Sequence, residues 1–153
     1  MDQVLSLPYR PKDFSACLSI FDGNAPRYFS PEERVEFIQF LGTIDHAANP
    51  YLVLTLNGSV VACGGLSINA ATRTASLSWG MVNEAYHRCG FGTRLTEERL
   101  NLARSLPDLV EVTLATSQHT YEFYERHGFK VARITADGFA EDLDRYDMTL
   151  RLA

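Results

Sequence analysis

The first third of the chain has the spacing of apolar residues that is typical of amphipathic helices. In the segment that begins at Asp13, apolar residues recur at i, i+3, i+4 and i+7, which places them on one face of a helix. These residues are Phe14, Cys17, Leu18 and Phe21. A second helix is predicted to begin at Pro31, because Ser30 can cap its N-terminus and Glu33 can complete a capping box.

Most of the remaining chain is predicted to form strands, because short segments are rich in apolar and β-branched residues. These segments are residues 4–7, 51–56, 60–66, 74–82, 110–115, 129–134 and 146–152. Asn57-Gly58 separates two of them and is a strong β-hairpin signal. Two more helices are predicted, one ending near Ser105 and one over residues 119–126, where Gly128 suits a left-handed cap.

The predicted order of elements is β-α-α-β-β-β-α-β-α-β-β. The early strands are joined by hairpins, which makes them antiparallel, whereas the later strand-helix-strand segment is a crossover. The chain shows no internal repeat, low-complexity segment or Pro/Ser-rich linker. We therefore expect one α/β domain over residues 1–153, with a mixed sheet and helices on both faces.

The composition is that of an ordinary globular protein, with 46% hydrophobic and 22% charged residues. The formal net charge of −5 argues against non-specific nucleic-acid binding and slightly favours cationic partners. Cys17, Cys63 and Cys89 are far apart, which argues against a disulfide framework or a thiolate metal site. No signal peptide or membrane-spanning apolar run is evident, so we expect a cytoplasmic protein that binds neither membrane nor nucleic acid.

The most informative local motif is the loop His87-Arg88-Cys89-Gly90-Phe91-Gly92, between a predicted strand and a predicted helix. Glycine allows a sharp turn and a close approach of backbone amides to a ligand. The unpaired N–H groups at the start of a helix bind anions. The motif therefore predicts a phosphate or pyrophosphate site, although Gly-x-Gly alone also occurs in ordinary turns.

This strand, loop and helix resemble the Q/R-x-x-G-x-G/A signature of the GNAT-type N-acetyltransferases. His87 stands at the Gln/Arg position of that signature, and Arg88 follows it. Further along, residues 123–129 resemble the second signature of the family, roughly Y-E-K-x-G-F. Ser117 stands where the family often has asparagine. The order of elements also matches the family along nearly the full chain.

The resemblance implies a GNAT-like domain in which mostly antiparallel N-terminal strands precede a parallel strand pair at the acyl-CoA cleft. It implies acetyl-CoA as the cosubstrate, with its pyrophosphate on the glycine loop. No metal is expected, because His119 and Glu122 lie one helical turn apart without a third ligand. Val82 is implied to polarise the thioester carbonyl through its amide, at the strand end where pantetheine pairs. The implied cofactor-binding residues are Met81, Val82, His87, Arg88, Cys89, Gly90, Phe91, Gly92, Thr93, Ser117 and Phe123.

Acetyl transfer to an amine involves two proton movements, one from the amine and one to the departing thiolate. Tyr124, at the tyrosine position of the family, is the candidate general acid. Its aromatic neighbours Tyr121 and Phe123 leave a packing role open as well. For the general base, Glu84, His119 and a chain of water molecules all remain open.

The sequence therefore predicts an acetyl-CoA-dependent N-acetyltransferase that acts on a primary amine of a small molecule or peptide. The acetyl group is expected to pass directly to the amine in a ternary complex. The alternative is a non-catalytic acyl-CoA-binding sensor or regulatory module. Exposed strand edges leave a homodimer open, and nothing in the sequence selects one acceptor amine.

Overall fold

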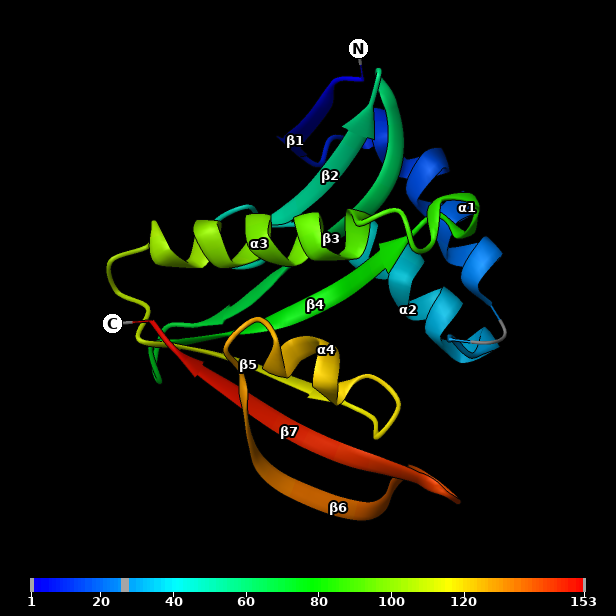
Figure 1. Cartoon of the computed structure of the whole chain (residues 1–153). Helices are drawn as coiled ribbons and strands as arrows, with labels where there is room; N and C mark the ends of the chain where they lie inside the picture. Colours follow the sequence, from blue (N-terminus) through cyan, green and yellow to red (C-terminus); the bar gives the residue numbers. More distant parts are fainter. Residues whose placement is uncertain (1, 26–27, 153) are drawn as a thin grey trace. The chain divides into compact units, whose positions relative to one another are not determined.

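The computed structural model describes residues 2–25 and 28–152 of the chain. Within these residues, seven strands form one mixed sheet in the order β1-β2-β3-β4-β5-β7-β6 (Figure 1). The strands are β1 (Val4–Pro8), β2 (Tyr51–Leu56), β3 (Ser59–Asn69), β4 (Thr74–Val82), β5 (Glu111–Thr116), β6 (Lys130–Ala140) and β7 (Leu143–Arg151). The helices are α1 (Phe14–Asn24), α2 (Pro31–Gly42), α3 (Phe91–Arg104) and α4 (Tyr121–Glu125), with 3-10 turns η1 (Pro11–Asp13) and η2 (Glu84–Tyr86). No helix in the described part of the chain is both long and apolar enough to cross a membrane.

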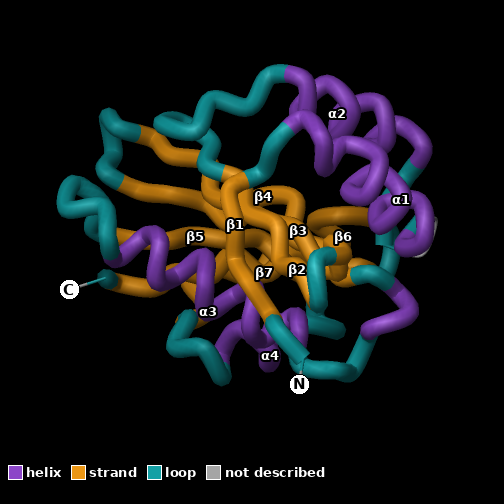
Figure 2. Tube along the Cα trace, turned by 90° about the horizontal axis from the view of Figure 1, so that it is seen from above, coloured by secondary structure: helices purple, strands orange, loops and turns teal. Residues whose placement is uncertain are grey.

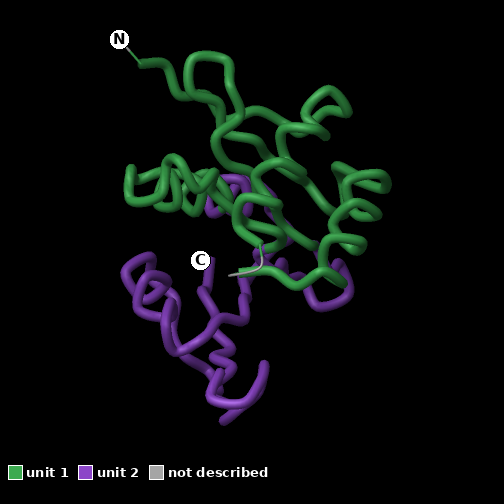
Figure 3. The backbone as a smooth tube through the Cα atoms, turned by 90° about the vertical axis from the view of Figure 1, so that its right-hand side faces the viewer, with its two compact units in different colours: residues 1–67, 78–99 green, residues 68–77, 100–153 purple. Residues whose placement is uncertain are grey.

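The chain divides into two compact units, shown in different colours in Figure 3. Unit 1 comprises the chain up to residue 67 together with residues 78–99. Unit 2 comprises residues 68–77 and the chain from residue 100 onward. The start of β4 therefore belongs to unit 2 and its end to unit 1.

Unit 1 contains the antiparallel part of the sheet. β1 pairs with β2 from Val4↔Leu56 to Pro8↔Leu52, and β2 pairs with β3. The predicted hairpin is confirmed, because Asn57 and Gly58 join β2 to β3 with positive φ angles of 50° and 89°.

Two apolar clusters cover the two faces of this part of the sheet. Helices α1 and α2 pack on Tyr51 and Val53, which are 1% exposed. The side chain of Leu54, the next residue of β2, faces the other way and packs against Leu95 of α3. Figure 2 shows α1 and α2 side by side, on the other side of the strands from α3. The predicted capping box of α2 is also confirmed, with Ser30 Oγ accepting from Glu33 N at 3.2 Å.

Unit 2 contains the parallel strand pair that the sequence predicted. β4 pairs with β5 in parallel from Thr74↔Glu111 to Ser76↔Thr113. β7 is antiparallel to both β5 and β6. The mixed α/β sheet with flanking helices is therefore confirmed.

The hairpin between β6 and β7 is longer than predicted. The sequence predicted strands over 129–134 and 146–152, whereas the structure has Lys130–Ala140 and Leu143–Arg151. The added length was not predicted, because the residues near the tip are polar and lack the apolar alternation of a strand. Asp137 and Asp142 adopt positive φ angles of 54° and 60° there. Gln118 holds this tip, donating to Asp142 O at 2.7 Å and accepting from Asp144 N at 2.8 Å.

Helix α4 is shorter than the predicted helix over 119–126. The preceding residues form a turn in which Ser117 O accepts from Thr120 N and Tyr121 N, both at 3.1 Å. Thr120 has a φ of −130°, outside the helical region, so the helix begins only at Tyr121. Gly128 has a φ of 97°, as expected of a left-handed residue after a helix.

Candidate functional site

The glycine loop leaves β4 through η2 and enters α3 within unit 1. Arg88 and Gly90 have positive φ angles of 65° and 87°. A Cβ added to Gly90 would meet nothing within 4 Å, so there is room for a larger residue. Glycine is favoured at this position because of the positive φ angle. The two left-handed residues turn the chain sharply, so that α3 begins directly after Gly90.

The start of α3 presents backbone N–H groups that have no acceptor among the described residues. The first helical bond runs from Arg94 N to Gly90 O at 3.0 Å, so the preceding N–H groups stay unpaired. These are the N–H groups of Gly90, Phe91, Gly92 and Thr93. Cys89 N differs, because it donates to Tyr86 O at 3.3 Å. A cluster of free donors at the positive end of a helix fits a pyrophosphate, and the exposed Arg88 side chain adds a cation beside it.

The carbonyl of Val82, the last residue of β4, accepts two side-chain hydrogen bonds. Asn24 of α1 donates through Nδ2 to this carbonyl at 2.9 Å and to Ile20 O at 2.8 Å. His87 Nε2 lies 2.8 Å from the same carbonyl, and it must donate because a carbonyl only accepts. The two donors occupy both lone pairs of the Val82 carbonyl.

Trp79 of β4 has an unusual backbone conformation close to this strand end. Its φ is 45°, in the region that bulky residues rarely adopt. Its carbonyl accepts from the Tyr51 hydroxyl at 2.7 Å. Tyr51 is 1% exposed, and burial raises its pKa well above the usual value, so the hydroxyl remains a donor. The hydrogen bond thus holds Trp79 in its left-handed conformation, while the indole packs on Phe37 at 5.1 Å between ring centroids.

Arg99 of α3 supports β4 from the opposite face. Arg99 is 3% exposed, and its guanidinium lies beside Gly80. A Cβ added to Gly80 would stand 2.8 Å from Arg99 Nη1, and one added to Gly64 would stand 3.1 Å from the Gly80 Cα. Glycine at both positions therefore lets β3, β4 and the buried guanidinium pack closely.

Glu84, a candidate general base, lies in η2 directly after β4. Its carboxylate rests against α1, because a Cβ added to Gly23 would stand 3.4 Å from Glu84 Oε1. Asn83 begins η2 by accepting from Ala85 N at 3.0 Å through its side chain. The Glu84 side chain is exposed, so solvent can reach its carboxylate.

Tyr124, the candidate general acid, lies in α4 of unit 2 and is half-buried. Its ring meets Phe129 edge-on at 6.0 Å and Phe123 at 5.0 Å. Its hydroxyl has no hydrogen-bond partner among the described residues. The ring is thus fixed by packing, and the hydroxyl is available to a ligand.

The other candidates of unit 2 lie at the turn before α4. Ser117 Oγ accepts from His119 N at 3.2 Å, so this side chain helps to form the turn. His119 itself is exposed. Phe123 packs against the His127 ring at 4.9 Å.

The structure groups the predicted site residues by unit. Unit 1 brings together residues 81, 82, 84 and 87–93 at the end of β4 and the start of α3. Unit 2 brings together Ser117, His119, Phe123 and Tyr124 at the turn before α4 and in α4 itself.

A model of the acetyltransferase (GNAT) family matches residues 14–129, which is most of the chain. The chain belongs to the GNAT acetyltransferase family. Members of this family are N-acetyltransferases that use acetyl-CoA, and the protein is an enzyme of this acyltransferase class. The matched residues include both the glycine loop and Tyr124.

Solved structures share the GNAT fold at low sequence identity. A protein from Desulfovibrio desulfuricans assigned to the GNAT family has a TM-score of 0.85 at 20% identity, covering 99% of this chain and 100% of its own. The ribosomal-protein-S18-alanine N-acetyltransferase of Escherichia coli has a TM-score of 0.80 at 20% identity, covering 100% and 95%. An aminoglycoside 6'-N-acetyltransferase complexed with coenzyme A has a TM-score of 0.80 at 13% identity, covering 97% of each chain. No match was found among curated proteins.

Three residues that support this candidate site were not predicted from the sequence. Asn24 follows Phe21 by three positions and lies on the buried face of α1, and Arg99 follows Leu95 by four on the buried face of α3. A polar residue on an apolar helical face is a signal that the sequence offers. Tyr51 offered no such signal, because its partner Trp79 is 28 residues away.

Proposed function

We propose that this GNAT enzyme transfers the acetyl group of acetyl-CoA directly to a primary amine of a small molecule or peptide, in a ternary complex. The observation that carries the proposal is the group of unpaired N–H donors at the start of α3. Backbone donors at the positive end of a helix bind a pyrophosphate without any side-chain charge. Bound acetyl-CoA supplies the activated acetyl thioester.

In this proposal, the loop and the end of β4 hold acetyl-CoA. The free amides of residues 90–93 bind the pyrophosphate, with Arg88 close by. Asn83 N donates to Val61 O of β3 at 2.8 Å, so by strand alternation the Val82 N–H points away from β3. This N–H is the proposed donor to the thioester oxygen, where charge develops during transfer.

The proposed proton transfers use Glu84 and Tyr124. Glu84 receives a proton from the attacking amine, directly or through water. Tyr124 gives its hydroxyl proton to the departing sulfur. This role is supported by the lack of a hydrogen-bond partner for the hydroxyl within residues 2–25 and 28–152. One amide bond forms, one thioester bond breaks, and the products are an acetylated amine and free thiol.

A free-thiol assay tests the proposal. The protein is mixed with acetyl-CoA and a panel of polyamines, aminoglycosides, amino acids and peptides, and thiol release is measured against an amine-free control. We expect amine-dependent release with at least one acceptor class, together with a matching mass increase on the acceptor. Binding of CoA without thiol release from any amine would favour the non-catalytic sensor instead. Failure to bind CoA at all would contradict both functions.

A further inference from the structure

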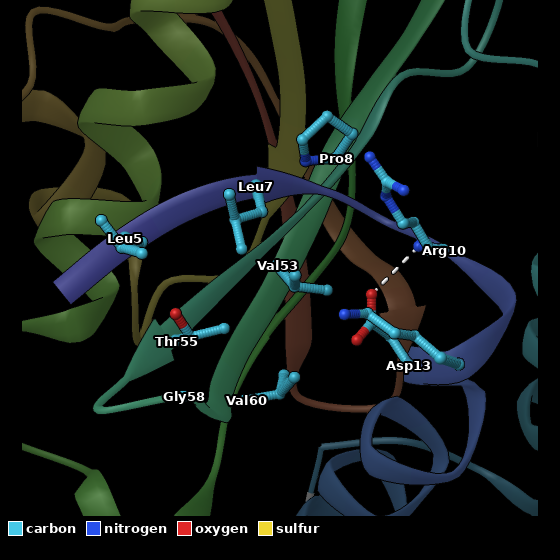
Figure 4. Close-up of a pocket in the computed structure, with 10 residues that line it drawn as sticks. Leu5, Leu7, Pro8, Arg10, Asp13, Val53, Thr55, Gly58 and Val60 are labelled. Carbon is cyan, nitrogen blue, oxygen red and sulfur yellow. Dashed lines mark hydrogen bonds between the residues drawn. The ribbon is translucent and has the colours of Figure 1, made fainter.

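A cavity of about 330 Å³ lies in unit 1 beside the edge strand β1 (Figure 4). Its lining residues come from β1, η1, β2, the β2–β3 turn and β3, together with Arg10 between β1 and η1. None comes from the glycine loop or β4. The volume is at the lower end of the range of roughly 300–1,000 Å³ that is usual for small-molecule sites. It therefore suits a ligand about as large as a free amino acid.

One part of the cavity is apolar. Leu5 and Leu7 lie on one face of β1 and are 42% and 41% exposed. Leu7 pairs in register with Val53, and Val60 of β3 also lines the cavity. Exposed leucines at positions i and i+2 form an apolar wall that no other described segment covers.

Two polar side chains that line the cavity are more than nine-tenths buried. Asp13 is 8% exposed, and its Oδ2 accepts from Arg10 N at 3.0 Å. A carboxylate can accept further hydrogen bonds beyond this one. Thr55 is 6% exposed, and its hydroxyl has no hydrogen-bond partner among the described residues. Polar groups with unused hydrogen-bonding capacity that line a cavity can bind a ligand there.

The cavity also carries two cations. Arg10 and Lys12 have exposed side chains, and neither forms an ion pair within 4.0 Å with any carboxylate of the described residues. Figure 4 shows Arg10 and Asp13 at the end of the cavity where β1 leads into η1, with Leu5 at the other end. The carboxylate of Asp13 and the cationic side chain of Arg10 thus lie at the same end of the cavity without forming an ion pair with each other.

We propose that this cavity binds an apolar α-amino acid in its zwitterionic form. The ammonium group of the ligand donates to Asp13, its carboxylate accepts from Arg10 and Lys12, and its side chain covers Leu7 and Val53. A simple carboxylate would face the charge of Asp13, and a simple amine would face two cations. A zwitterion satisfies both ends, and the apolar wall selects its side chain. The site is separate from the acetyl-transfer chemistry and does not depend on it.

Isothermal titration calorimetry without acetyl-CoA tests this site with three probes of the same carbon skeleton. L-Leucine carries both charges, isocaproate lacks the ammonium, and isoamylamine lacks the carboxylate. Because each charge-assisted contact is worth roughly tenfold in affinity, we expect L-leucine to bind at least about tenfold more tightly than either analogue. No binding of L-leucine up to about 10 mM, the weak limit for a ligand of this size, would overturn the proposal. Equal affinity for isocaproate would overturn it as well.

Substitutions then assign the two ends of the ligand. Lys12→Met is expected to weaken L-leucine several-fold and leave isoamylamine unchanged. Lys130→Met, which removes the second lysine of the chain outside the cavity, is the matched control and should change neither. Asp13→Asn keeps an oxygen for Arg10 N but loses the charge, so it should abolish the preference for L-leucine over isocaproate. If Lys12→Met and Lys130→Met behave alike, the carboxylate end of the proposal is wrong, even where Asp13→Asn fails to fold.

Discussion

Replacement of Tyr51 by phenylalanine would remove one hydrogen bond from the support of β4 and leave the packing in place. The hydroxyl donates to Trp79 O at 2.7 Å, and the ring is 1% exposed. Without this donor, a partly buried carbonyl is left unpaired. Trp79, with its φ of 45°, also loses the contact that offsets its backbone strain.

The structure gives the size of the expected effect. The lost bond contributes about 1 kcal/mol, and the unpaired carbonyl adds a further penalty of about 1 kcal/mol or more. For a chain of this length, 1 kcal/mol corresponds to a change in Tm of roughly 2–4 °C, so we expect Tm to fall by about 4–8 °C. Because relaxation of Trp79 would also move Gly80 to Val82, kcat is expected to fall by about tenfold to a hundredfold. The affinity for CoA should change little, since the α3 amides are untouched.

Scanning calorimetry and the thiol assay at saturating acetyl-CoA measure the two effects. Tyr9→Phe is the matched control, because Tyr9 touches the Tyr51 ring at 5.9 Å and its hydroxyl has no hydrogen-bond partner among the described residues. The control should keep wild-type Tm within about 2 °C near neutral pH. A Tyr51→Phe enzyme with unchanged Tm and kcat would show that this hydroxyl does not hold Trp79.

Three further predictions concern the loop, the general acid and pH. Gly92→Glu should abolish CoA binding in calorimetry and preserve the circular dichroism spectrum, because a carboxylate would repel the pyrophosphate. The control Gly42→Glu, where an added Cβ meets nothing within 4 Å, should bind CoA normally. Retained CoA binding in Gly92→Glu would refute the loop assignment. Tyr124→Phe should lower kcat about tenfold or more and leave the affinity for CoA intact. Equal activity in Tyr124→Phe and the control Tyr121→Phe would show that Tyr124 has only a packing role. Burial raises the pKa of Tyr9 from 10.0 to about 12, so the folded protein retains a proton that the unfolded chain loses in this window. The stabilisation from Tyr9 is therefore complete below pH 10 and declines as the pH rises toward 12. When the pH is raised from below 10 to above 10, the urea midpoint of unfolding should fall less for Tyr9→Phe than for the wild type.

Local sequence signals were sufficient for most of the fold. The hairpin at Asn57-Gly58 and the capping box from Ser30 to Glu33 depend on residues a few positions apart, and the structure confirms both. The β6–β7 hairpin was predicted too short, because its tip is formed by backbone bonds to Asp137 and Asp144 side chains. Such bonds replace the apolar alternation by which strands are recognised.

The same difference between local signals and contacts of residues far apart in the sequence applies to the candidate site. The glycine loop could be proposed as an anion site from the sequence, because conformational freedom and helix-start donors are local properties of the chain. The supports at Tyr51 and Arg99 were not found, because they act across strands that only the fold brings together. Propensity and spacing contain no information on such partners.

The amide of Asn24 limits how far α1 can be changed by engineering. Its two N–H groups reach Ile20 O and Val82 O, so α1 cannot slide or rotate by one residue without releasing the end of β4. Substitutions at solvent-facing positions of α1 leave these two bonds in place, whereas a substitution of Asn24 removes both. A library built on α1 should therefore keep Asn24 constant, because its loss would release the end of β4.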